Sequence, residues 1–139
     1  FRSTGGGTST AGSYVTRTLN TISDPFGIVT SLSSNQFVLP AGTYDVMASV
    51  PAAQTDAHRA KLRNITAGTD AILESSCYTG NAYNVDTNSV IQGQITITSA
   101  TTFEIQHRVG VAVATFGFGH PANDGLNEIY TQVKILKIK

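Results

Sequence analysis

Few residues in this sequence have the types and spacing that catalysis requires. Asp56 lies two positions before His58, and His120 lies four positions before Asp124, but chance supplies such spacings readily. The chain has no Gly-x-Ser-x-Gly elbow, no His-Glu-x-x-His zinc motif and no phosphate-binding Gly-Lys-Ser/Thr loop. The sequence therefore predicts neither an enzyme nor a bound cofactor or metal.

Three basic residues form the clearest charge pattern. Arg59, Lys61 and Arg63 alternate along a stretch of strand character, so their side chains would share one face of a sheet as a basic ridge. The residues that would face the other side are His58, Ala60 and Leu62. Such a ridge suits an anionic sugar or a phosphate group. The alternative is a solvated strand face whose charges pair with neighbouring Asp and Glu.

Two single residues have competing interpretations. His107 alternates with Phe103 and Ile105, which predicts a hydrogen-bonded histidine that points inward. The alternative is three copies of it meeting at a trimer axis around an ion. Cys77 is the only cysteine, so an internal disulfide is excluded, and without an activating motif we expect a buried structural thiol.

Two loops hold most of the candidate ligand-binding residues. The loop 78–88 combines two tyrosines with amides. In such loops tyrosine rings stack on sugar rings, while Asn and Asp bind the sugar hydroxyls. A solvated turn without a ligand explains this loop equally well. The loop 116–125 alternates phenylalanine with glycine, and its phenylalanines are either core residues or an exposed patch. The predicted ligand-binding residues are Tyr78, Asn81, Tyr83, Asn84, Asp86, Asn88, Arg59, Arg63, Phe118 and His120.

Length and charge limit the possible functions. The chain has 139 residues, enough for one domain with its own core. Its 9 basic and 9 acidic side chains cancel, which argues against nucleic-acid binding, and no apolar run is long enough to insert into a membrane. Residues 1–12 are mostly Gly, Ser and Thr, which predicts a flexible lead-in. Because the chain opens with Phe1 and its only methionine is Met47, we expect a piece of a longer protein.

Residues 13–139 form a succession of short runs rich in Thr, Val and Ile and separated by turn residues. The expected strands are 14–22, 28–32, 36–39, 44–50, 59–65, 71–78, 90–98, 102–109, 111–116 and 128–138. About ten short antiparallel strands without a helix predict a single all-β domain, a sandwich or barrel.

The stretch 36–50 is the most specific pattern in the chain. Pro40 fixes its own φ and Gly42 suits a tight reversal, so two strands meet at this turn. After it, one face of a half-buried strand is formed by Tyr44, Val46, Ala48 and Val50. This Phe-x-Leu-Pro-x-Gly-x-Tyr-x-Val pattern resembles the entry into the second main strand of complement globular-head and tumour-necrosis-factor-like jelly rolls. Those are trimeric recognition domains.

Further segments resemble the carboxy-terminal domain of bacteriophage tail fibres and related virion proteins. They are 49–52, 58–66, 102–108 and 127–135, in that order. The resemblance implies a trimeric jelly-roll sandwich at the exposed tip of a virion fibre, joined to an upstream segment of the same chain. It also implies binding, without chemistry, to a bacterial surface glycan or another envelope component. The alternatives are a module that trimerises or decorates the virion without host contact and, more distantly, a carbohydrate-active enzyme.

The last expected strand has apolar residues on both faces. One face holds Ile129, Val133 and Ile135, and the other holds Tyr130, Leu136 and Ile138. A contact between subunits would cover the second face. The alternative is that Leu136 and Ile138 pack beneath the lead-in. The predicted trimer-interface residues are Tyr130, Leu136, Ile138 and His107.

Overall fold

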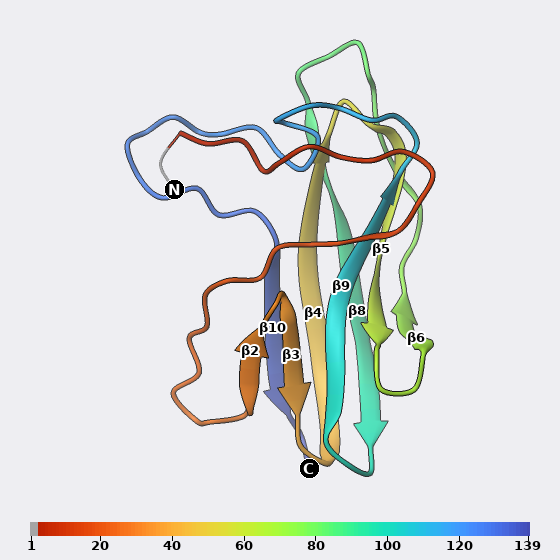
Figure 1. Ribbon diagram of the computed structural model, residues 1–139, viewed down its shortest axis with the longest axis vertical. Helices are drawn as coiled ribbons and strands as arrows, with labels where there is room; N and C mark the ends of the chain where they lie inside the picture. Colours follow the sequence, from red (N-terminus) through yellow and green to blue (C-terminus); the bar gives the residue numbers. More distant parts are fainter. Residues whose placement is uncertain (1–2) are drawn as a thin grey trace.

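Two antiparallel β-sheets pack against each other in the computed structural model, which describes residues 3–139 (Figure 1). The strands are β1 (Val15–Thr16), β2 (Ser31–Ser33), β3 (Gln36–Leu39), β4 (Gly42–Ala53), β5 (Asp56–Asn64), β6 (Thr69–Leu73), β7 (Cys77–Thr79), β8 (Asp86–Ile97), β9 (Thr101–Val109) and β10 (Gln132–Lys137). This described range contains no helix, and so none that is long and apolar enough to cross a membrane. The predicted all-β jelly-roll sandwich is confirmed.

The chain passes between the sheets at the predicted reversal. The larger sheet has the order β2-β3-β9-β5-β6, with β1 beside β9 and β7 beside β5, and the smaller sheet has the order β10-β4-β8. At the turn from β3 to β4 the Tyr44 hydroxyl donates to the Pro40 carbonyl at 2.7 Å. A Cβ at Gly42 would lie 2.8 Å from the carbonyl oxygen of Lys139, so the close approach of the C-terminus favours glycine here.

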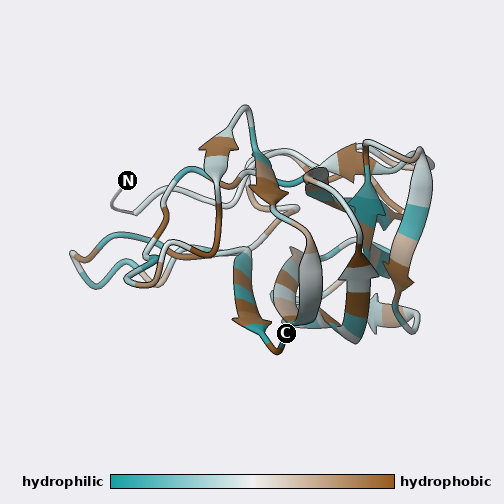
Figure 2. Cartoon of the chain, turned by 90° about the horizontal axis from the view of Figure 1, so that it is seen from below, coloured by the Kyte–Doolittle hydropathy of each residue, from teal (hydrophilic) through white to brown (hydrophobic). Residues whose placement is uncertain are grey.

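Alternation along the strands builds the core between the sheets. Figure 2 shows hydrophilic and hydrophobic bands following each other along the strands. The face of β4 that the sequence predicts as apolar is buried and consists of Tyr44, Val46, Ala48 and Val50. The larger sheet contributes Phe37 and Phe103, whose ring centroids lie 5.8 Å apart. Burying each such large apolar side chain stabilises the fold by about 1.5–3 kcal/mol.

Residues 3–12 lie along the segment 111–119 and form hydrogen bonds with it. The Gly6 amide donates to the Gly119 carbonyl at 2.9 Å, and the Ser9 amide donates to the Val113 carbonyl at 2.9 Å. A Cβ at Gly6 would collide with the carbonyl oxygen of Phe118, so the two segments approach this closely only because the residue is glycine. Sequence reasoning did not anticipate these contacts of the lead-in 1–12, whose first two residues lie outside the described range.

Several expected strands differ in the structure. The run 111–116 is not a strand, because its backbone turns and hydrogen-bonds to residues 7–9 instead of to a sheet. Of the expected strand 14–22 only Val15–Thr16 pairs, with β9. The expected strand 71–78 is interrupted and gives β6 and β7, which both pair with β5. Ile129 lies before β10 and is exposed, so it does not share the buried face of that strand.

Candidate functional site: loops at one end of the sandwich

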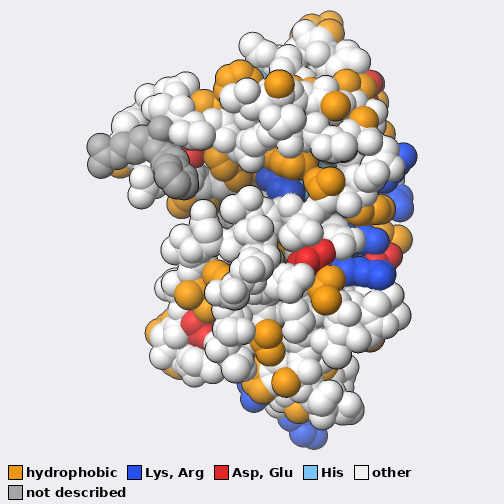
Figure 3. Space-filling view, viewed as in Figure 1, with side chains coloured by type: hydrophobic (Ala, Val, Ile, Leu, Met, Phe, Trp, Pro, Cys, Tyr) orange, Lys and Arg blue, Asp and Glu red, His pale blue; other side chains and the backbone are white. Residues whose placement is uncertain are grey.

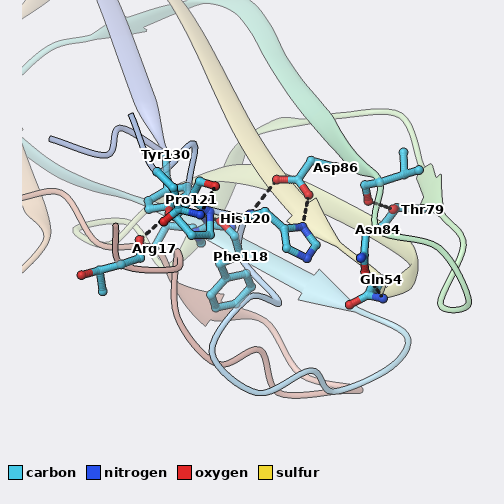
Figure 4. A network of polar contacts seen from close by, with 12 residues as sticks. Arg17, Gln54, Thr79, Asn84, Asp86, Phe118, His120, Pro121 and Tyr130 are labelled. Carbon is cyan, nitrogen blue, oxygen red and sulfur yellow. Dashed lines mark hydrogen bonds and ion pairs between the residues drawn. The ribbon is translucent and has the colours of Figure 1, made fainter. Parts of the chain in front are cut away.

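The predicted ligand-binding loops meet at the end of the sandwich where β4 turns into β5 (Figure 1). We call this region the loop end; it comprises residues 54–56, 78–88 and 114–126. His120 Nδ1 lies 2.5 Å from Asp86 Oδ1, and the His120 amide donates to Asp86 Oδ2 at 2.8 Å (Figure 4). Because Asp86 is the first residue of β8, the sheet holds this contact in place. The loops 78–88 and 116–125 are therefore neighbours.

The loop between β7 and β8 is fastened to the β4–β5 turn. The Asp56 carboxylate accepts from the Tyr78 hydroxyl at 3.1 Å and from the backbone and side-chain amides of Asn81, each at 3.2 Å. The Gln54 side-chain amide donates to Asn84 Oδ1 at 3.0 Å. The hydrogen bond to Asp56, and then the charge of Asp56, raise the pKa of Tyr78. Asp56 thus positions this loop.

Two aromatic side chains of the segment 78–88 are exposed, beside exposed polar residues and Val85. Tyr83 is 71% exposed and Tyr78 is 65% exposed. Asn81 and Asn84 use side-chain groups in contacts with the β4–β5 turn, so they order the loop. The surface offered here is therefore a pair of tyrosine rings on a hydrogen-bonded loop, and such rings can stack on a sugar at low entropic cost.

The two phenylalanines of the second loop have different environments. Phe118 is almost fully buried; its ring stacks on His107 with centroids 5.7 Å apart, and the Arg17 guanidinium carbon lies 4.1 Å from its centroid. The core interpretation is thus confirmed for Phe118, and its assignment as a ligand-binding residue is wrong because its ring is not accessible. Phe116 is partly exposed and stacks on His120, with centroids 5.2 Å apart.

A chain of hydrogen bonds runs through the interior behind the loop end. Arg17 Nη1 lies 2.8 Å from His107 Nδ1, and His107 Nε2 lies 2.9 Å from His58 Nδ1. His58 Nε2 lies 2.8 Å from Thr87 Oγ1. Arginine can only donate, so His107 Nδ1 accepts, and each ring donates to the next member of the chain. Both histidines are therefore neutral in this arrangement, and the partner of His58 is His107 rather than Asp56.

Burial explains why the two histidines stay neutral. Desolvation and then the charge of Arg17 lower the pKa of His58 to about 4; desolvation, Arg17 and His58 lower the pKa of His107 to about 2. Burial also lowers the pKa of Arg17 to about 9, which leaves it charged at neutral pH. His107 is fully enclosed within one chain, so its assignment to a trimer interface is wrong and the interpretation as a hydrogen-bonded buried histidine is confirmed.

The three residues of the basic ridge have different partners. Lys61 Nζ and Arg63 Nη1 each lie 2.8 Å from Asp70 Oδ1, so the alternative of pairing with a neighbouring carboxylate is confirmed for these two residues. Arg59 donates instead to the Ser76 hydroxyl at 2.6 Å. The ridge therefore does not present three equivalent free cations.

Asn88 and Cys77 have structural contacts. Asn88 lies on the exposed face of β8, where its Oδ1 accepts from the Ser49 hydroxyl at 3.1 Å. Cys77 is partly buried rather than fully buried, and its Sγ lies 3.5 Å from the Asn88 carbonyl oxygen.

The apolar residues of the expected last strand divide into two groups. Val133 and Ile135 pack against the core, whereas Leu136 and Ile138 are 56% and 50% exposed. They are thus not packed beneath the lead-in. The Tyr130 hydroxyl donates to the Thr4 carbonyl, so Tyr130 contacts its own chain.

A groove of about 1180 Å³ opens between the lead-in, the segment 15–24 and β10. Figure 3 shows a hollow with basic and apolar side chains on this side of the molecule. Its lining includes Arg17, Leu19, Phe37, Val133 and Ile135. Sequence reasoning did not single out Arg17. The available signal was its alternation with Val15 and Leu19, which places all three on one side of an extended chain.

In the part of the chain that the structure describes, no group of three or more His, Cys, Asp and Glu side chains is placed to hold a metal ion. No model of a known protein family matches the chain, and no curated protein sequence matches it.

Proposed function

We propose that this chain is the receptor-binding tip of a bacteriophage tail fibre or a comparable virion appendage. Its loop end would bind a bacterial surface glycan or another envelope component. The observation that carries the proposal is the exposure of Tyr78 and Tyr83 on a loop that hydrogen bonds fasten to the β4–β5 turn. An ordered loop loses little entropy on binding, and tyrosine rings supply a face for a sugar.

In the proposed arrangement three copies of the chain share one fibre tip and are joined to an upstream segment of the same polypeptide. A single loop site of this size binds weakly. When three sites engage one cell surface together, avidity multiplies the affinity by roughly 10²–10⁴ where the geometry permits. The proposed trimer therefore supplies the affinity that the loops alone lack.

The experiment is adsorption of the purified, labelled chain to a panel of intact bacterial cells. We expect Tyr83→Ala combined with Asn84→Ala to abolish adsorption to any strain that the unchanged chain binds. The melting temperature should barely move, because surface truncations alter stability by about 0.5 kcal/mol or less.

Phe26→Ala is the matched control. Phe26 is the most exposed aromatic residue of the described chain, at 85%, but lies outside the loop end, so its removal should leave adsorption intact. Adsorption that survives the double substitution, or fails equally with Phe26→Ala, would contradict the proposed site.

A second candidate function is trimerisation or decoration of the virion without host contact. The observation that favours it is the half-exposed pair of Leu136 on β10 and Ile138 just after it. Among the described strands, β10 pairs only with β4. A chain that forms trimers and adsorbs to no cell type would support this alternative.

A further inference from the structure

Two arginines lie directly opposite each other on the larger sheet. Arg59 of β5 and Arg108 of β9 are register partners. Side chains at such positions start about 4.5–5.5 Å apart at Cβ, and like charges there destabilise a sheet. Within the described residues, neither arginine has a carboxylate within ion-pairing distance.

The same strand face balances its other cations. Arg63 and Lys61 share Asp70, and Glu104 is the register partner of Arg63. The absence of a balancing carboxylate is therefore particular to the Arg59–Arg108 pair, and not a general property of the basic ridge.

A pocket of about 230 Å³ lies at this pair. Its lining consists of Tyr14, Ala57, His58, Arg59, Ser76 and Arg108, and it contains no acidic residue. Arg59 Nε is buried and has no hydrogen-bond partner among the described residues. Arg59 Nη2 donates to the Ser76 hydroxyl, and Arg108 Nε donates to the Gly12 carbonyl at 3.3 Å. Each guanidinium carries five N–H donors, so most donors of the pair remain available.

We propose that Arg59 and Arg108 bind the phosphate group of a phosphorylated envelope glycan, with Tyr14 beside them. A phosphate dianion would neutralise both cations and accept several charge-assisted hydrogen bonds, including one at the buried Arg59 Nε. This inference rests on the proposed function, because it names a chemical group of the same receptor.

The position of the pocket fits one extended ligand. His58 pairs with Cys77 of β7, and β7 leads directly into the loop that carries Tyr83. Tyr78 is the register partner of Ala57, which lines the pocket, so Tyr78 and the pocket share one face of the sheet. A ligand stacked on Tyr78 can therefore extend toward the pocket.

The test is a titration of the chain with inorganic phosphate, glucose 6-phosphate and glucose at constant ionic strength, followed by amide chemical shifts. We expect both phosphate compounds to bind at Tyr14, Arg59 and Arg108. Arg59→Gln and Arg108→Gln should each weaken binding about tenfold or more, because a charge-assisted hydrogen bond contributes about 1.5–3 kcal/mol. Arg63→Gln is the control and should leave the affinity unchanged. Both test variants should remain folded, since each removes one of two like charges.

The site would be overturned if Arg63→Gln weakened phosphate binding equally, or if glucose alone shifted the amides of Tyr14, Arg59 and Arg108. Tighter binding of glucose 6-phosphate than of inorganic phosphate supports a phosphorylated glycan, whereas equal or weaker binding overturns that choice of ligand. The phosphate site and the proposed receptor-binding function can be contradicted by different results. Tyr83→Ala with Asn84→Ala should spare the phosphate titration, and loss of cell adsorption alone leaves the phosphate site standing.

Discussion

Arg17, His107 and His58 place one fixed positive charge and two titratable rings in a single hydrogen-bonded chain inside the sandwich. Arg17 has carbonyl partners, Pro51 and Phe118, rather than a carboxylate. Protonating either ring would add a second buried positive charge and would remove the acceptor that the chain of donors requires. The folded state therefore binds protons at these rings less readily than the unfolded chain does.

This arrangement predicts that stability falls as pH falls. Both histidines have pKa values below 6.5 in the folded chain, about 4 for His58 and about 2 for His107. Below pH 6.5 the two histidines bind protons in the unfolded chain but not in the folded chain. Each histidine should then lower the free energy of unfolding by up to about 1.4 kcal/mol per pH unit, until the pH reaches the pKa of that histidine in the folded chain. Above pH 6.5 neither contributes a slope.

Urea unfolding between pH 8 and about pH 5 measures this effect before the carboxylates of the unfolded chain titrate. His58→Gln should remove that residue's share of the slope while leaving the share of His107. A free energy of unfolding that stays constant from pH 8 to pH 5 would contradict the buried neutral pair.

Residue types predicted some of these roles and not others. The alternation of His107 with Phe103 and Ile105 indicated an inward side chain, and it is fully buried. The alternation of Arg17 with Val15 and Leu19 was a weak signal, because an arginine in a short run is usually a surface residue. Its partners Pro51, His107 and Phe118 lie 34, 90 and 101 positions away, so only the tertiary structure brings them together.

Among the elements, strands with strict alternation were the most predictable. β4 and β5 bury the faces that the sequence indicates, because each has one face on the core. The segment 111–116 looked like a strand but is not one. Its hydrogen bonds go to a glycine-rich lead-in that is distant in sequence, and local propensity carries no signal for that contact.

β10 supports a prediction at the scale of the element. Leu136 is half exposed in the single chain and faces Asp45 of β4 in register. Leu136→Asp should weaken the fold of the single chain modestly, because the position is exposed but the new carboxylate lies opposite that of Asp45. It should nevertheless dissociate the proposed trimer, because it would bury an unpaired charge in the subunit contact.

Light scattering measures the outcome. We expect the unchanged chain to have three times the 14.6 kDa mass of one chain, and the Leu136→Asp chain to have the mass of one. Leu73→Asp is the matched control, since Leu73 is 53% exposed on the other sheet and should not affect assembly. A mass near 14.6 kDa for the unchanged chain at micromolar concentration would contradict the trimer.

At the scale of the whole molecule, the core of the sandwich is separate from the loop end that we propose for receptor binding. The two sheets hold the core, and the loop end gathers segments that are remote in sequence through the contacts of Asp86 with His120 and of Asp56 with Tyr78. The adjacency of the two loops could be predicted from the fold class. The hydrogen bonds that order the loop beside the exposed tyrosine rings could not, because they depend on the β4–β5 turn.

The most direct test of this account is amide chemical-shift mapping of the labelled chain with envelope glycan fragments from a strain that it binds. We expect the largest shifts at Tyr78, Tyr83 and their neighbours in 78–88, with smaller ones in 114–126 and at Arg59 and Arg108. Shifts confined to the outer face of β10, β4 and β8, with none at the loop end, would contradict the claim that the loops bind the receptor.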